Sequence, residues 1–192
     1  MAKISSGLYL SSDFFLNNFY SNNRNVIKKN NRNDYSKLEL SYEDSRALSK
    51  AAKRLPQNDY GSKEEDTKDD NINDTTKASI QAFVSVYNNT LDSGKSSTDY
   101  DTQHYIKRLR TMTKNHADEL EDIGITIEKD GKLTVNEDLL KISDNSKVEK
   151  IFSSDNEFSK QVMKFANKLN FAIQNDIYSQ INGKGLHINI TM

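Results

Sequence analysis

Three histidines, at positions 104, 116 and 187, are the side chains of this sequence best suited to binding a metal or transferring a proton near neutral pH. His104 and His116 are separated by more than three helical turns, or about 18 Å along a single helix. They therefore cannot form one site without side chains from other helices. His116 also falls on an apolar seam, where we expect a packed structural histidine.

The segment TIEKDGKLTVNE, from Thr126 to Glu137, is similar to a calcium-binding loop in that Gly131 would occupy the sixth position. Glu128, Asp130 and Glu137 would then fall on positions 3, 5 and 12. Position 1, which is normally Asp, is Thr126. A β-hairpin across Asp130-Gly131 explains the same residues without a metal. A small calcium-binding module is an alternative, but we expect no metal and no other cofactor.

No pattern in the sequence supports an enzyme. The chain has no cysteine, which excludes thiol nucleophiles, disulfides and cysteine metal sites. Its seven glycines are scattered rather than clustered in a phosphate loop, and neither G-x-S-x-G nor H-E-x-x-H occurs. Paired carboxylates at 64–65 and 69–70 lie in a stretch without apolar residues to build a pocket. We therefore expect no catalytic residues.

The composition favours a thin helical fold with balanced charge. The 192 residues include 27 Lys and Arg against 28 Asp and Glu, so the chain lacks the basic surplus of nucleic-acid-binding proteins. Hydrophobic residues make up 34% and the mean hydropathy is −0.83, which suits an elongated helical layer better than a thick core. No segment approaches the roughly 18 to 20 apolar residues that span a bilayer. We expect neither membrane insertion nor a cleaved secretory signal.

Two polar segments are predicted to lie outside the helical core. Residues 1–40 are Asn-rich and basic, and we expect a flexible N-terminal arm that binds a partner or feeds an export channel. Residues 56–74 are acidic and almost free of apolar residues, which predicts an exposed loop. That loop lies within the expected helical domain, residues 41–192. The arm also contains an aromatic cluster of Phe14, Phe15, Phe19 and Tyr20.

A first helix is predicted over residues 41–55. Its apolar residues fall on one stripe, and Pro56 ends it. Ser41 and Asp44 resemble a capping box with Asp in place of Glu, in which two side chains satisfy free N–H groups of the first turn. The stripe consists of Ala47, Leu48, Ala51, Ala52 and Leu55.

Three longer helices are predicted over residues 75–93, 101–123 and 157–181, where apolar residues recur at spacings of three and four. The second helix has the most regular pattern, a heptad seam with two polar members. We expect these helices to form an elongated antiparallel bundle. The seam consists of Ile106, Leu109, Thr113, His116, Leu120 and Ile123.

A β-hairpin is predicted at 125–135, between the second and third long helices. Asp130-Gly131 is a strong signal for its turn. Asn136 can then cap a short helix, and a second short helix is predicted over residues 145–152. The expected fold class is mainly α, an elongated antiparallel helical bundle with one short β-hairpin.

This helix–hairpin–helix region resembles the C-terminal conserved region of the flagellar filament-capping protein family, also called hook-associated protein 2. DELEDIGITIEKDGKLTVNEDLLK followed by KVEKIF has the family's order and spacing, and QAFVSVYNNTL is similar to the family's F-V-x-x-Y-N segment. The similarity covers about residues 40–170, and its specificity lies in the combination. The matching residues are Phe83, Val84, Tyr87, Asn88, Leu120, Ile123, Gly124, Ile125, Asp130, Gly131, Leu133, Leu139, Val148 and Phe152.

The resemblance implies an exported structural protein at the tip of the bacterial flagellum, extracellular and without enzymatic activity. Such caps are homo-oligomers that assist the insertion of flagellin. The expected partners are therefore further copies of this chain and flagellin or other flagellar axial proteins, and not nucleic acid. Family members are longer and end in a long coiled-coil helix, so we expect a fragment or a short paralogue.

Two further expectations concern how such a protein would work. We expect Phe83, Tyr87 and the heptad seam to hold the bundle together, which leaves partner contacts to the termini and the exposed hairpin edge. The alternative function is a cytoplasmic helical interaction protein, either a flagellar regulator or an export chaperone, derived from the same domain.

Overall fold

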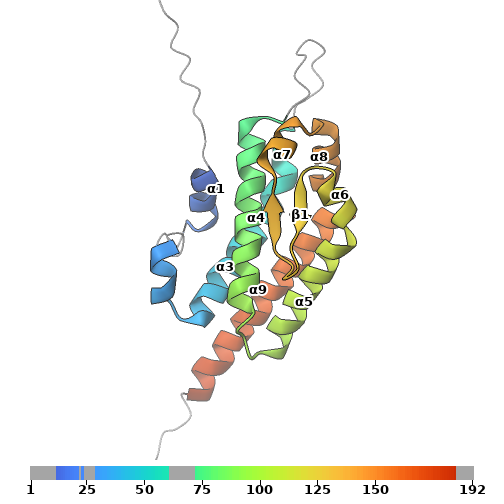
Figure 1. The fold of residues 1–192 in the computed structure, drawn as a ribbon. Coiled ribbons are helices and arrows are strands. Elements are labelled where there is room, and N and C mark those ends of the chain that lie inside the picture. Colours follow the sequence, from blue (N-terminus) through green and yellow to red (C-terminus); the bar gives the residue numbers. More distant parts are fainter. Residues whose placement is uncertain (1–11, 22, 24–28, 61–71, 185–192) are drawn as a thin grey trace, which may run out of the picture.

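The computed structural model describes residues 12–21, 23, 29–60 and 72–184, with side chains described throughout except at 29–30 and 181–184. Helices pack side by side along one long axis, and a two-stranded hairpin lies on one face (Figure 1). The predicted fold class, mainly α with one short β-hairpin, is confirmed.

Four long helices of the described chain form the bundle. Each runs antiparallel to the one before it (Figure 1). The last helix packs between the first and the third, and the first also packs on the second. The helix at the start of the domain is therefore a full member of the bundle, beside the three predicted long helices. The four are α3 (Lys37–Arg54), α4 (Asp74–Gly94), α5 (Tyr100–Asn115) and α9 (Glu157–Lys184).

Helix α3 begins before the predicted start at residue 41. Its N-cap is Ser36, whose Oγ accepts a hydrogen bond from the Glu39 N–H at 3.3 Å, while the Glu39 carboxylate accepts from the Ser36 N–H at 2.9 Å. The capping box predicted at Ser41 and Asp44 is therefore wrong, and both of these residues are buried inside the helix. The predicted apolar stripe is confirmed, because all its members are buried: Ala47, Leu48, Ala51, Ala52 and Leu55.

The segment predicted as a flexible arm contains a packed helix. Helix α1 (Ser12–Phe19) lies against α4 and buries Phe15, Phe19 and the adjacent Tyr20. A short 3₁₀ helix, η1 (Lys29–Asp34), then leads into α3. The described residues before residue 41 thus belong to the packed domain, in contrast to the prediction. The remaining residues of the arm lie outside the described part of the chain.

The predicted acidic loop at 56–74 is anchored at both ends. Its first residues belong to a 3₁₀ turn, η2 (Leu55–Gln57). Tyr60 and Ile72, which lie toward its two ends, are buried. Asn73 caps α4 by accepting a hydrogen bond from the Thr76 N–H at 2.7 Å. The loop's middle, residues 61–71, lies outside the described residues.

The predicted 101–123 helix is divided in two at His116. Its φ of −111° and ψ of 23° are not helical, so α5 ends before it and α6 (Ala117–Glu121) begins after it. The ring of His116 packs against Phe158, with ring centroids 5.6 Å apart, which is the packed position expected for it. The other seam residues are buried: Ile106, Leu109, Thr113, Leu120 and Ile123.

The hairpin consists of β1 (Ile125–Ile127) and β2 (Leu133–Val135), paired antiparallel with Thr126 opposite Thr134. Its turn is longer than the two-residue turn expected from Asp130-Gly131. The Gly131 N–H donates to the Glu128 carbonyl, and the Glu128 N–H donates to the Lys132 carbonyl, both at 2.8 Å. Gly131 has φ +88°, so it supplies the left-handed residue of a three-residue turn.

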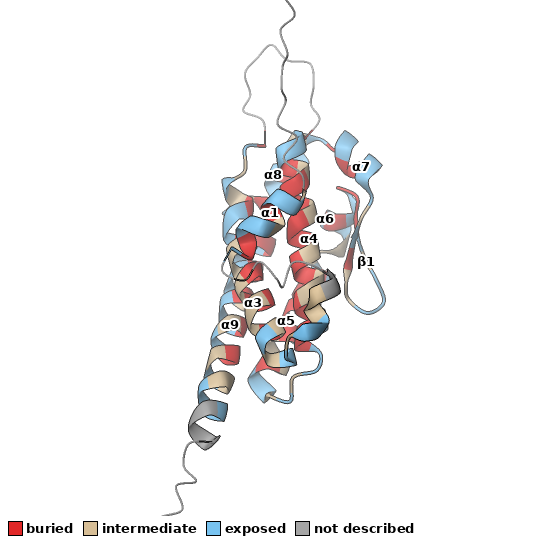
Figure 2. Ribbon diagram, turned by 90° about the vertical axis from the view of Figure 1, so that its left-hand side faces the viewer, coloured by how far each residue is buried: buried red, intermediate tan, exposed pale blue. Residues whose placement is uncertain are grey.

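Two short helices follow the hairpin, α7 (Glu137–Ile142) and α8 (Asn145–Phe152). The predicted cap is confirmed, because Asn136 accepts a hydrogen bond from the Leu139 N–H at 3.1 Å. Buried residues line the inner faces of the bundle helices and the inner side of α8 (Figure 2). At the centre, Phe83, Phe152 and Phe158 join α4, α8 and α9, with ring centroids 6.0 to 6.4 Å apart.

Candidate functional site

Asn88 of α4 holds the outer edge of the hairpin. Its side-chain amide donates to the carbonyl of Leu133, and its side-chain oxygen accepts from the N–H of the same residue, both at 2.8 Å. Leu133 is one of two residues of β2, with Val135, whose backbone groups point away from β1, since the positions between and beside them carry the hairpin's own bonds. Asn88 thus takes the place of a neighbouring strand.

Tyr87, the preceding residue, adds a buried contact to the hairpin turn. Its hydroxyl donates to Thr113 Oγ1 of α5 at 3.0 Å, and the carbonyl oxygen of Gly131 lies 3.4 Å away. Burial raises the pKa of Tyr87 to about 12, so the hydroxyl remains a donor at neutral pH. We call this set the hairpin junction: Tyr87, Asn88, Thr113, Gly131 and Leu133.

Ten of the fourteen residues that resemble the family motif are buried. Gly124 has φ +80° and lies so close to α7 that an added Cβ would be 2.8 Å from Leu139 Cβ. Asp130 and Leu139 are exposed, and Asn88 and Gly131 are half-buried. These motif residues therefore mainly build the fold. The buried members are Phe83, Val84, Tyr87, Leu120, Ile123, Gly124, Ile125, Leu133, Val148 and Phe152.

The carboxylates of the calcium alternative are engaged separately. Glu128 accepts a hydrogen bond from the Thr134 hydroxyl at 3.0 Å, and Asp130 accepts from the Lys132 N–H at 3.0 Å. The third, Glu137, pairs with Lys77 of α4 at 3.4 Å. Within the described ranges, no group of three or more His, Cys, Asp or Glu residues is arranged to hold a metal.

The histidines are also apart. His104 stacks on Tyr100 near the start of α5, with ring centroids 6.2 Å apart. His116 lies at the helix break, where its Nδ1 is 3.3 Å from a carboxylate oxygen of Glu119. His187 lies outside the described residues.

Sequence reasoning missed a buried ion pair that fastens the N-terminal segment to α3. Asp44 is fully buried, and the guanidinium of Arg32 binds both its oxygens, at 3.0 and 2.6 Å. The Tyr20 hydroxyl donates to the same carboxylate at 2.7 Å. Burial and the Asp44 charge together raise the pKa of Tyr20 well above its ordinary value. The feature of the sequence that indicates this ion pair is a charged residue, Asp44, beside the apolar stripe of α3.

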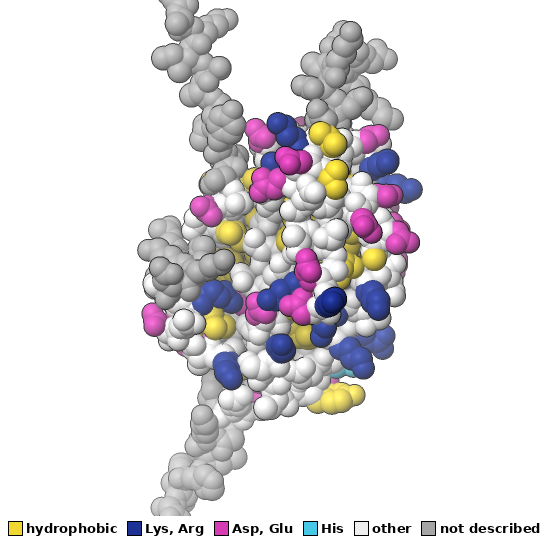
Figure 3. Space-filling model, viewed as in Figure 1, with side chains coloured by type: hydrophobic (Ala, Val, Ile, Leu, Met, Phe, Trp, Pro, Cys, Tyr) yellow, Lys and Arg dark blue, Asp and Glu magenta, His cyan; other side chains and the backbone are white. Residues whose placement is uncertain are grey.

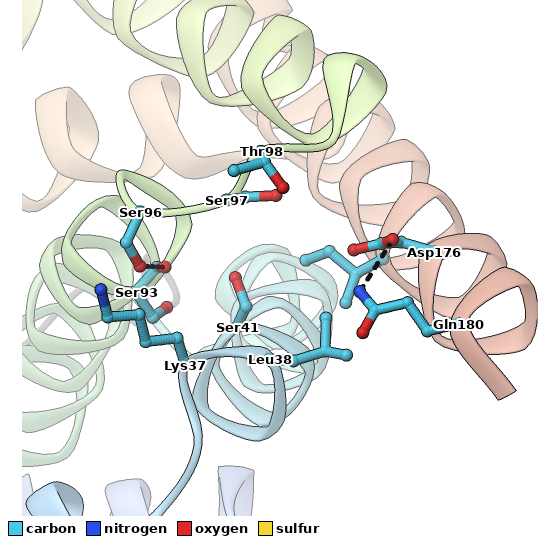
Figure 4. A pocket seen from close by; sticks show the side chains of 10 residues that line it. Lys37, Leu38, Ser41, Ser93, Ser96, Ser97, Thr98, Asp176 and Gln180 are labelled. Atoms are coloured by element: carbon cyan, nitrogen blue, oxygen red, sulfur yellow. Dashed lines mark hydrogen bonds between the residues drawn. The ribbon is translucent and has the colours of Figure 1, made fainter. Parts of the chain in front are cut away.

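A cavity of about 120 Å³ lies between the start of α3, the α4–α5 connection and α9 (Figure 4). The hydroxyls of Ser41 and Ser93 are buried there without a hydrogen-bond partner in the described chain. Lys37 lies at one side, and on the other Gln180 donates to Asp176 at 3.1 Å. Unpaired hydroxyls in a cavity of this size suit bound water.

Helix α9 exposes three large apolar side chains on its outer face. Met163, Phe171 and Tyr178 are 39%, 63% and 64% exposed, and their spacings of eight and seven residues place them on one side of the helix. We call these residues the α9 stripe. An exposed apolar stripe at helical spacing is a surface on which another helix can pack.

Comparisons of the chain with family models, with curated proteins and with solved structures find no match. Among the described helices, none has the length and apolar character to cross a membrane. A functional assignment therefore has to be argued from the motif residues and the surfaces of the fold.

Proposed function

We propose that the protein is a structural component of the bacterial flagellum, similar in role to the filament cap, that associates with copies of itself and assists flagellin assembly at the filament tip. The observation that carries this proposal is the bond between Asn88 and Leu133. These residues come from two separate segments that resemble the family. Their direct contact supports treating the two segments as one motif rather than as two chance similarities.

The surfaces of the fold support a role in assembly. The motif residues are used in packing, whereas the α9 stripe presents Phe171 and Tyr178 to solvent. Burying such aromatic side chains against a partner helix is favourable by about 1.5–3 kcal/mol each. The α9 stripe is therefore the surface through which we propose that copies of the chain associate.

The first experiment is deletion of the gene in the flagellated bacterium that carries it, scored for motility in soft agar and for flagellin in the medium. A capping role predicts loss of filaments with monomeric flagellin in the medium. Complementation with the wild-type gene restores filaments, whereas the Phe171→Asp/Tyr178→Asp variant does not. Light scattering on the purified proteins should show an oligomer for the wild type and a monomer for this variant.

A matched control carries the same added charge elsewhere. Gln57→Asp/Ser154→Asp alters two exposed residues away from the α9 stripe and should restore motility. Normal motility of the deletion strain without flagellin in the medium would contradict the capping role. Recovery of the protein from the cytosol, bound to flagellar subunits and missing from sheared filaments, would instead support the regulator or chaperone alternative.

A further inference from the structure

A groove of about 590 Å³ separates α5 from the hairpin. The side of α5 forms one wall, and β1 with its turn forms the other. Ala117 and Ile127 give it apolar contacts. We call it the α5–β1 groove. It is distinct from the α9 stripe, and it shares Gly131 with the hairpin junction.

The wall formed by β1 is a strand edge. Ile127 lies opposite Leu133 in the hairpin register. The bonds on either side, from Glu128 N–H to Lys132 and from Asn136 N–H to Gly124, show which positions pair across the hairpin. By this alternation, the N–H and C=O of Ile127 point away from β2.

The two edges of the hairpin are treated differently. On β2, Asn88 satisfies the outward groups of Leu133. On β1, no side chain in the described part of the chain forms hydrogen bonds with the N–H and C=O of Ile127. Ile127 lines the groove instead. An outward-facing strand residue of this kind can accept an added strand from another chain.

The rim of the groove is cationic. Lys107, Arg110 and Lys114 follow one another at spacings of three and four along α5, so they share a face, and Lys129 adds a cation from the turn. Among the described lining residues Glu128 is the one carboxylate, and it is bonded to Thr134. Figure 3 shows Lys and Arg side chains gathered over the lower part of this face, where α5 and the hairpin turn lie.

We infer that the α5–β1 groove binds an acidic, extended segment of a partner protein, which adds to β1 as a third strand with its carboxylates facing the α5 cations. The inference does not depend on the proposed flagellar function. The strand edge selects a peptide backbone, and the cations select acidic side chains. A nucleic acid fits less well, because its affinity requires a wider basic surface than a chain with net charge −1 provides.

The test uses the full chain and a fluorescein-labelled peptide of alternating glutamate and valine, with binding followed by fluorescence anisotropy. This peptide should bind, and its affinity should fall as salt rises. The same peptide with lysine in place of glutamate should not bind. The Lys107→Glu/Lys114→Glu variant should weaken binding by about tenfold or more. The control variant Lys53→Glu/Lys141→Glu has the same change in charge at exposed sites outside the groove and should stay within about twofold of the wild type.

The amide of Ile127 distinguishes strand addition from attraction by charge alone. On adding the glutamate peptide, its NMR signal should shift and its hydrogen exchange should slow. Ile127→Pro, which removes this donor, should weaken binding, whereas Ile127→Val should retain it. Binding that leaves the Ile127 amide unchanged would overturn the strand addition.

Three further outcomes would overturn the proposal. The first is that the glutamate peptide fails to bind, or that the control variant weakens binding as much as the groove variant. The second is that a single-stranded DNA oligonucleotide of equal charge binds more tightly than the peptide. The third is that the unliganded protein associates with itself and that Lys107→Glu/Lys114→Glu dissociates it, which would make a second copy the occupant. The motility assay has no bearing on any of them.

Discussion

Asn88 and Leu133 lie 45 residues apart in the chain, and the amide side chain of the first forms two hydrogen bonds of 2.8 Å with the backbone of the second. This contact fixes the hairpin to the face of α4. It also satisfies the backbone groups of Leu133, which β1 leaves unpaired. Asn88 is therefore a main contact, beside Tyr87, that positions the hairpin on the bundle.

Replacing Asn88 tests this dependence. Asn88→Ala leaves the N–H and C=O of Leu133 without their protein partner, so we expect the free energy of unfolding to fall by about 1–3 kcal/mol. Asn88→Asp keeps an acceptor for the Leu133 N–H, so its free energy of unfolding should lie between those of the wild type and Asn88→Ala. Urea unfolding measures the change, with exposed Asn175→Ala on α9 as the control. Equal losses for Asn88→Ala and Asn175→Ala would refute the role of the amide.

The ion pair between Arg32 and Asp44 gives a second prediction. Asp44→Ala leaves the Arg32 guanidinium and the Tyr20 hydroxyl without their shared acceptor, and breaking a buried pair in this way lowers stability by about 3–5 kcal/mol. Tyr20→Phe removes the hydrogen bond to Asp44 and a longer one of 3.5 Å from Asn89, and should cost about 1 kcal/mol. Glu43→Ala, one residue away and less buried, is the control for urea unfolding. If Asp44→Ala behaves like this control, the N-terminal segment is not fastened through Asp44.

Two glycines with positive φ should differ in their tolerance of alanine. Gly124 and Gly131 have φ of +80° and +88°, so each alanine costs about 1–2 kcal/mol from backbone conformation alone. A Cβ on Gly124 would also meet the Leu140 backbone nitrogen at 3.0 Å. A Cβ on Gly131 meets Arg110 Nε at 2.6 Å, near the end of a flexible side chain that can move. Thermal unfolding should therefore rank Gly124→Ala as the less stable variant, and the reverse order would be unexpected.

Buried tyrosines make stability fall at alkaline pH. Because burial raises the pKa of Tyr87 from 10.0 to about 12, the unfolded chain releases this proton between these values while the folded chain keeps it. The folded state then binds more protons, so the free energy of unfolding decreases as pH rises above 10. The contribution of the raised pKa is fully present below that pH.

Tyr87→Phe removes about 1.4 kcal/mol per pH unit from this slope. Urea unfolding of both proteins from about pH 9 to about pH 12 should therefore give stabilities that converge as pH rises. Parallel curves over this range would show that Tyr87 is not buried as described.

Local patterns in the sequence were enough to predict most of the helices. Apolar spacings of three and four give the long helices because each turn repeats the same signal. The cap at Asn136 and the turn at Gly131 were predictable because these residue types have strong local preferences. The break at His116 was not, since neither Gly nor Pro marks it.

The errors arose where tertiary contacts decide the role of a residue. Ser41 and Asp44 have the spacing of a cap, but Asp44 is held by Arg32 from a separate segment, and such a contact leaves no periodic signal. Helix α1 has only 8 residues, and its buried rings, Phe15 and Phe19, form a single i, i+4 pair, so the pattern is too short to predict its packing on α4.

The candidate sites were only partly predictable. The resemblance selected Tyr87 and Asn88, but their partners in the hairpin are known only from the fold. The α5–β1 groove combines cations of α5 with the edge at Ile127, and neither segment alone indicates a binding surface.

Helix α9 is the last of the four bundle helices to be synthesised, yet it packs between α3 and α5. Until it has left the ribosome, the apolar residues of both neighbours that face it remain uncovered. The nascent chain therefore cannot close its bundle before α9 has been synthesised and has left the exit tunnel. During that interval the apolar faces of α3 and α5 are open to any protein that binds unfolded chains.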